Sequence, residues 1–172
     1  MKSTLTILLL FAFSFSNAQS GEKPKPVKRK VQFKDFAFSP GIIVQHETFL
    51  EFNVMLGEVT DINGKIPIVG IEGFRLGVET NLRDGRNHTI APKFGYEFSM
   101  TLFSLRLSAV NYFQNGNSEF RILPEIGLSI GGWANLTYGY GIPLNNGNLN
   151  NVSCHRVALS FNINKRLYNA MN

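Results

Sequence analysis

From Phe36 almost to its end, the chain alternates large apolar residues with small or polar ones at a period of two. The run from Ile90 to Met100 is the clearest example, with aromatic and aliphatic residues at the even positions and Ala, Lys, Gly, Glu and Ser between them. Successive side chains of a β-strand point to opposite faces, so each run predicts a strand with one apolar and one polar face. No stretch after residue 30 has the periodicity of an amphipathic helix, and none is apolar over the length of a transmembrane helix. The pattern predicts an all-β fold.

The alternation divides into eight expected strands, at residues 36–45, 48–57, 68–80, 90–100, 103–109, 120–130, 134–142 and 156–164. In the third of them, Glu72 stands on the apolar side. Segments 61–64, 83–87, 114–117 and 145–148 are rich in Asn, Asp and Gly, which tolerate the positive φ of tight turns. Consecutive hairpins give an up-and-down meander, which must close or cover its edges. Because no helix is expected to cover an edge, we predict a closed antiparallel barrel of about eight strands, an even number as bacterial single-chain barrels require.

The polar face of these strands consists mainly of Gly, Ser, Ala and Asn with isolated charges. A face exposed to water would carry mostly Lys and Glu, whereas small residues suit the narrow interior of an eight-stranded barrel. We therefore predict a transmembrane barrel with its apolar face toward lipid. A soluble barrel of the lipocalin type would place the apolar face inside, and alternation alone is compatible with both arrangements.

Nine charged residues fall on the predicted inward face, four of them anionic and five cationic. An unpaired buried charge is costly, so in a confined lumen these groups must pair. We predict a salt-bridge network that plugs the lumen; a carboxylate pair for acid–base chemistry or a charged pore constriction would use the same residue types. The nine residues are Glu51, Arg75, Glu79, Lys93, Glu97, Arg106, Arg121, Glu125 and Arg156.

Aromatic residues near the expected strand ends fit the interfacial girdles of membrane barrels. Two of them, Phe49 and Tyr112, stand at the inward parity. The candidate girdle residues are Phe36, Phe49, Phe98, Phe103, Tyr112, Phe113, Tyr138, Tyr140 and Tyr168.

The first residues predict export. Lys2 precedes an apolar run from Leu5 to Phe15, and Ser16-Asn17-Ala18 supplies the small residues of a cleavage site. The run is too short to cross a hydrocarbon core as a helix, which takes about 20 residues. The expected layout is a signal peptide at 1–18, a basic Lys/Pro-rich leader at 19–35, the barrel at 36–168 and a C-terminal tail at 169–172. The leader is either a flexible segment or a tether to anionic headgroups. Export argues against nucleic acid as a partner despite the net charge of +5.

No motif predicts an enzyme, a cofactor or a metal site. Cys154 is the single cysteine, and its neighbour His155 would point to the opposite face of a strand. His46, His88 and His155 are far apart and lack the spacing of zinc ligands. The match of residues 127–131 to Gly-x-Ser-x-Gly lies inside an alternating strand and not on a strand-to-helix elbow.

The signal ending in Ser16-Asn17-Ala18-Gln19, the eight alternating segments and the Asn/Gly-rich hairpins resemble small outer-membrane β-barrel proteins of the Bacteroidetes type, similar to the eight-stranded OmpA/OmpX class. The resemblance implies a monomer in the outer membrane of a Gram-negative bacterium, in contact with its lipid and inserted by the outer-membrane assembly machinery. A plugged barrel would have a structural role or present its loops, especially 144–153, to an extracellular partner. The alternatives are a narrow channel or transport protein and a soluble lipocalin-like carrier of a small apolar ligand. The plugged barrel is preferred, because eight strands usually leave no continuous aqueous passage.

Overall fold

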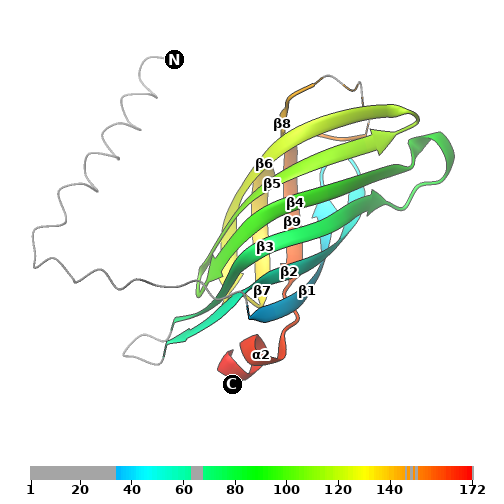
Figure 1. The fold of residues 1–172 in the computed structure, drawn as a ribbon. Helices are drawn as coiled ribbons and strands as arrows, with labels where there is room; N and C mark the ends of the chain where they lie inside the picture. Colours follow the sequence, from blue (N-terminus) through cyan, green and yellow to red (C-terminus); the bar gives the residue numbers. More distant parts are fainter. Residues whose placement is uncertain (1–33, 63–67, 146, 148, 150, 172) are drawn as a thin grey trace, which may run out of the picture. The chain divides into compact units, whose positions relative to one another are not determined.

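The computed structural model describes residues 34–62, 68–145, 147, 149 and 151–171, and the structural statements below concern these residues. The expected signal peptide and nearly all of the leader lie outside them. The described residues form a closed antiparallel barrel (Figure 1), as predicted. Its strands are β1 (Asp35–Val44), β2 (Thr48–Ile62), β3 (Ile68–Asn81), β4 (Thr89–Met100), β5 (Phe103–Gln114), β6 (Asn117–Ile130), β7 (Ala134–Tyr140), β8 (Ile142–Pro143) and β9 (His155–Phe161).

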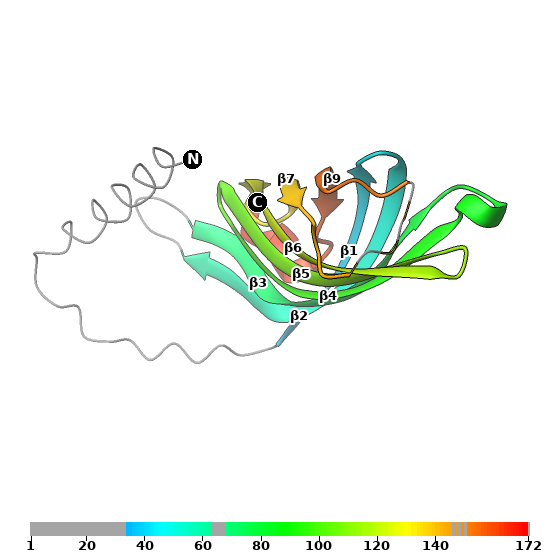
Figure 2. The same ribbon diagram turned by 90° about the horizontal axis from the view of Figure 1, so that it is seen from above.

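Each strand pairs with its neighbours in chain order, and β9 closes the barrel by pairing with both β7 and β1. The two-residue β8 continues β7, because both pair with β6, so the barrel wall has the eight strands expected from the sequence. Figure 2 shows how the long hairpins of β2 to β6 curve around the barrel. The seam between β1 and β9 is short: the ladder holds 4 residue pairs, against 14 between β2 and β3.

The alternation of each strand places its apolar face outward. Leu76 on β3, Leu105 on β5 and Leu128 on β6 are exposed, whereas the residues between such positions are buried. The prediction that Phe49 and Tyr112 belong to an outward girdle is wrong. Both side chains are buried inside the barrel, where their rings pack edge to face with centroids 6.3 Å apart. Their inward parity was the correct signal.

The C-terminal segment differs from the sequence expectation, which had no helix after residue 30. The last strand ends at Phe161, and a short helix, α2 (Lys165–Met171), crosses the expected boundary at residue 168. Asn164 caps it: its side-chain oxygen accepts a hydrogen bond from the Leu167 amide at 2.9 Å, and its side-chain nitrogen donates to the Phe36 carbonyl. A helix of seven residues is too short to show a helical period in the sequence.

Apolar residues fill the interior near each end of the barrel. We call the end that carries α2 the terminal end, and the end that carries the β1–β2, β3–β4, β5–β6 and β8–β9 connections the loop end. At the terminal end the fully buried Leu167 of α2 packs in a cluster with Ala37, Met55, Val59 and Ile71. The loop-end cluster includes Val152 and Leu149 from the β8–β9 connection, and its other members are Ile43, Phe49, Ala91, Val110, Tyr112, Leu123 and Ala158.

Candidate functional site: the charged interior

The inward face of the barrel carries a concentration of charge between the two apolar clusters. Along β2, for example, Glu51 and Asn53 lie between Phe49 of the loop-end cluster and Met55 of the terminal-end cluster. All nine charged residues predicted for the lumen point into it, and each side chain is buried. The period of two is sufficient to place them there, because every inward position on a strand shares its parity.

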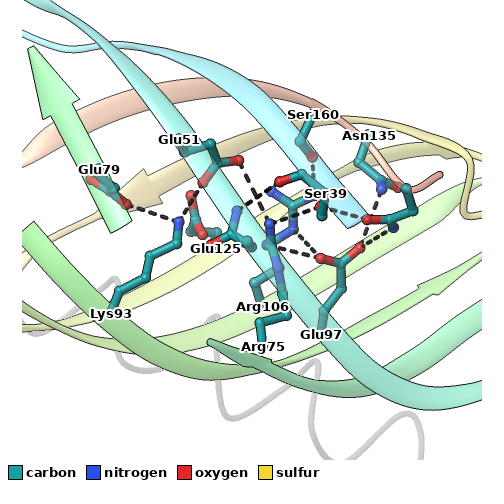
Figure 3. A network of polar contacts seen from close by, with 12 residues as sticks. Ser39, Glu51, Arg75, Glu79, Lys93, Glu97, Arg106, Glu125, Asn135 and Ser160 are labelled. Carbon is teal, nitrogen blue, oxygen red and sulfur yellow. Dashed lines mark hydrogen bonds and ion pairs between the residues drawn. The ribbon is translucent and has the colours of Figure 1, made fainter. Parts of the chain in front are cut away.

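Eight of the nine form one continuous series of ion pairs in which anions and cations alternate. Figure 3 shows the part of the series from Glu79 to Arg106. Four carboxylates and four cations sum to zero charge, and every carboxylate has a cation within 4.0 Å. In order, the series is Glu125, Arg156, Glu79, Lys93, Glu51, Arg75, Glu97 and Arg106.

Glu79 is one of two carboxylates on which the bonds of the series converge. Arg156 donates to both of its oxygens at 2.9 Å, in the two-pronged geometry that suits a guanidinium. Lys93 donates to it at 2.9 Å and also bonds Glu51, and the Tyr112 hydroxyl donates at 3.1 Å. Because β1 and β2 separate β3 from β9 in the wall, the Glu79–Arg156 pair crosses the lumen.

Glu97 is the corresponding centre nearer the terminal end. It pairs with Arg75 at 2.9 Å and with Arg106 at 3.0 Å. Neutral side chains satisfy its other oxygen: Ser99 donates at 2.7 Å and Asn162 at 2.9 Å. Further neutral partners are Asn135, which donates to Glu97, Ser39, which accepts from Arg75, and Ser160, which accepts from Arg106. Sequence reasoning that selected charged residues had no reason to single out these neutral ones.

Arg121 stands apart from the series, near the loop end. It pairs with Glu119, a buried carboxylate that the sequence analysis missed. The expected strand began at residue 120, but Glu119 has the same parity as Arg121, and this signal could have identified it. Arg121 also donates to the carbonyl of Ser153 at 2.6 Å, and its guanidinium lies 5.4 Å from the Tyr112 ring centroid. It thereby ties the β8–β9 connection to the barrel wall.

This arrangement of paired charges suits stabilisation of the barrel better than acid–base catalysis. Acid–base catalysis by two carboxylates needs environments that separate their proton affinities and leave one accessible to substrate. Here Glu51 and Glu79 share Lys93 and are fully buried. Within the described ranges, no group of three His, Cys, Asp or Glu residues is placed to hold a metal ion.

Among the described residues, no helix is both long and apolar enough to cross a membrane.

Comparison with protein-family models, with curated proteins and with solved structures gave no match to this chain.

Proposed function

We propose that this chain is a transmembrane β-barrel of a bacterial outer membrane, with a filled interior and a structural or loop-mediated role. The observation that carries the proposal is the inverted polarity of the barrel: charge is collected inside and large apolar side chains are presented outside. A protein that folds in water does the opposite, because burial of apolar surface drives its folding.

The outward surface is too apolar for a barrel surrounded by water. In the described part of the chain, 32 large hydrophobic side chains are exposed. The Asp, Glu, Lys and Arg residues at outward positions of the strands are Glu58 and Glu72, which lie directly opposite each other near the terminal end. Monomeric soluble proteins rarely expose contiguous apolar patches larger than a few hundred Å². The strands also have a suitable length, since about 9–11 tilted residues cross a bilayer and β1, β4 and β5 have 10, 12 and 12.

The filled interior supports a structural role over transport or carriage. A carrier of apolar ligands needs an apolar cavity, and the middle of this lumen is occupied by paired charges. A channel needs a continuous polar path, and here apolar clusters lie toward both ends of the charged layer. The proposal therefore assigns no catalytic, carrier or conducting role to the barrel. It places the loop end, with the β8–β9 connection, on the extracellular side as the surface available to a partner.

Fractionation and gel mobility test the membrane location. The full chain, expressed in a Gram-negative host, is expected in the outer-membrane fraction, to require detergent for extraction and to migrate differently on gels before and after heating. Recovery as a soluble periplasmic monomer would contradict the proposal. In planar bilayers the purified barrel is expected to give no sustained discrete current steps, and such steps would favour the channel.

A further inference from the structure

An apolar groove runs over β5 and β6 on the outward face. Its floor is aliphatic and formed by two pairs of residues in register, Leu105 with Ile126 and Leu107 with Pro124. Its volume of about 570 Å³ falls within the range of about 300–1,000 Å³ typical of ligand sites. An apolar groove with an aliphatic floor fits a hydrocarbon chain.

Aromatic side chains form the two walls of the groove. Tyr96 and Phe98 of β4 lie opposite Leu107 and Leu105 of the floor, and Tyr138 of β7 lies opposite Ile126. A second apolar hollow of about 270 Å³ shares Tyr96 and Leu107 with the first and continues it past Ala109.

A polar hollow of about 300 Å³ lies on the other side of Tyr138, which lines both spaces. Its apolar base is Val44 and Val157, and its polar lining includes Gln45, His46, Ser153 and His155. The side-chain nitrogen and oxygen of Gln45 are both buried without a hydrogen-bond partner.

His155 is held in place beside this hollow. Its Nδ1 is hydrogen-bonded to the Tyr138 hydroxyl at 2.5 Å, and its ring packs edge to face on Tyr140 with centroids 5.0 Å apart. Among the described residues, no side chain bonds the other ring nitrogen, Nε2. If the Tyr138 hydroxyl donates to Nδ1, Nε2 carries the proton and is a hydrogen-bond donor.

An apolar groove and a polar hollow that meet at one side chain fit an amphiphile. The hollow offers the imidazoles of His46 and His155 and the hydroxyl of Ser153 as donors, which suit phosphate oxygens, and its described polar lining contains no carboxylate. A peptide strand is a poor candidate, because the groove lies over the middle of a closed sheet with no free edge.

We propose that this surface binds one phosphate-bearing membrane lipid, with an acyl chain in the groove over β5 and β6 and the phosphate in the hollow beside His155. The proposal rests on the membrane location proposed above and adds a defined lipid site to it.

Native mass spectrometry of the detergent-purified full chain tests the site, with dipalmitoyl phosphatidate as the probe and dipalmitoylglycerol, which lacks the phosphate, as the comparison. One bound phosphatidate per barrel is expected, with diacylglycerol bound about tenfold more weakly because it makes no phosphate hydrogen bonds. Absence of a phosphatidate adduct, or equal binding of the two lipids, would overturn the proposal.

Two pairs of variants locate the site. Leu105→Trp fills the groove floor and is expected to weaken phosphatidate binding about tenfold, since each buried methylene contributes about 0.8 kcal/mol and tenfold corresponds to about 1.4 kcal/mol. Leu76→Trp, on the outward face of β3 and outside the groove, is expected to leave binding unchanged. His155→Ala is expected to reduce binding severalfold, and His88→Ala, an exposed histidine outside the hollow, is its control.

Equal binding by Leu105→Trp and Leu76→Trp would show that lipid coats the barrel without a defined site, and the inference would fail. A wild-type dimer that Leu105→Trp dissociates would identify the groove as a contact between two copies and would overturn it as well. Heat-dependent gel mobility confirms that each variant is folded. Fractionation before the titration separates the two proposals: a barrel found in the membrane that binds no phosphatidate contradicts only the lipid site.

Discussion

Glu79→Gln is the substitution that most directly tests how the charged interior stabilises the barrel. Glutamine has nearly the same size as glutamate, so the change leaves no cavity and removes one negative charge. The neutral series then carries a net charge of +1, and Arg156 and Lys93 lose the carboxylate that both bind at 2.9 Å.

The expected cost follows from the burial of this cluster. Removing one partner of a buried ion pair typically costs about 3–5 kcal/mol, because it leaves the other charge buried and uncompensated. Tenfold in an equilibrium constant corresponds to about 1.4 kcal/mol, so the unfolding constant is expected to rise by a factor of roughly 10² to 10³ or more. The control is Glu47→Gln, since Glu47 pairs with the largely exposed Arg83 at 3.0 Å, and the glutamine oxygen can keep the hydrogen bond that Glu47 accepts from Asn81. Because Arg83 remains in contact with water when the charge is removed, this pair is expected to contribute about 0–1 kcal/mol.

The chain's single tryptophan, Trp133, provides the assay. Its ring packs against Phe161 with centroids 5.3 Å apart, so unfolding by urea in lipid vesicles is expected to change its fluorescence. Glu79→Gln should lower the free energy of unfolding by several kcal/mol relative to Glu47→Gln. A difference below about 1 kcal/mol would refute the reasoning, because the interior would then have to be hydrated enough to screen the lost charge.

Three further substitutions address other parts of the fold, with the same unfolding measurement. Leu167→Ala, in the terminal-end cluster, is expected to cost about 2–5 kcal/mol, while Tyr168→Ala, at an exposed position of the same helix, should cost much less; equal effects would contradict a role for α2 in filling the barrel. Gly57→Ala should prevent formation of the heat-modifiable barrel, because the added Cβ would lie 1.9 Å from the carbonyl oxygen of Glu72. A stable, folded Gly57→Ala protein would show that β2 and β3 do not approach so closely. Val54→Arg, at an outward position in the middle of β2, should cost about 2–4 kcal/mol in a bilayer, and a neutral effect would argue against lipid at that surface.

The sequence predicted the strands best where the alternation was least interrupted. The expected strand at 90–100 corresponds to β4 at Thr89–Met100. The ends of β5 and β6 were missed: the expected strands ended at residue 109 and began at residue 120, because Asn111 and the polar Asn117 to Glu119 interrupt the apolar alternation. Polar residues are tolerated there because these hairpin ends lie at the loop end of the barrel.

The position of the charges could be predicted, but their pairing could not. Parity alone directs Glu79 and Arg156 inward. Their contact depends on the stagger of strands around the closed barrel, which brings together residues 77 positions apart on strands that are not neighbours. The helix α2 was missed for a different reason: its stability comes from the Asn164 cap and from Leu167 in the barrel interior, and neither leaves a period in the sequence.

The short seam between β1 and β9 has a consequence for how the barrel forms. This junction joins the first strand to the last, whereas each other junction of the wall joins strands that are consecutive along the chain and held close by a connection. Its 4 ladder pairs are supplemented by the β-bridge between Phe38 and Ile163 and by two side-chain hydrogen bonds. The Ser39 hydroxyl donates to the Asn162 side chain, and the Asn164 side chain donates to the Phe36 carbonyl. Closing the barrel therefore costs the entropy of bringing together two strands that are far apart in the sequence, and it forms few backbone hydrogen bonds in return. Side chains of the segment after β9 complete the closure. The three residues that follow β9, Asn162 to Asn164, therefore fasten the last strand to the first.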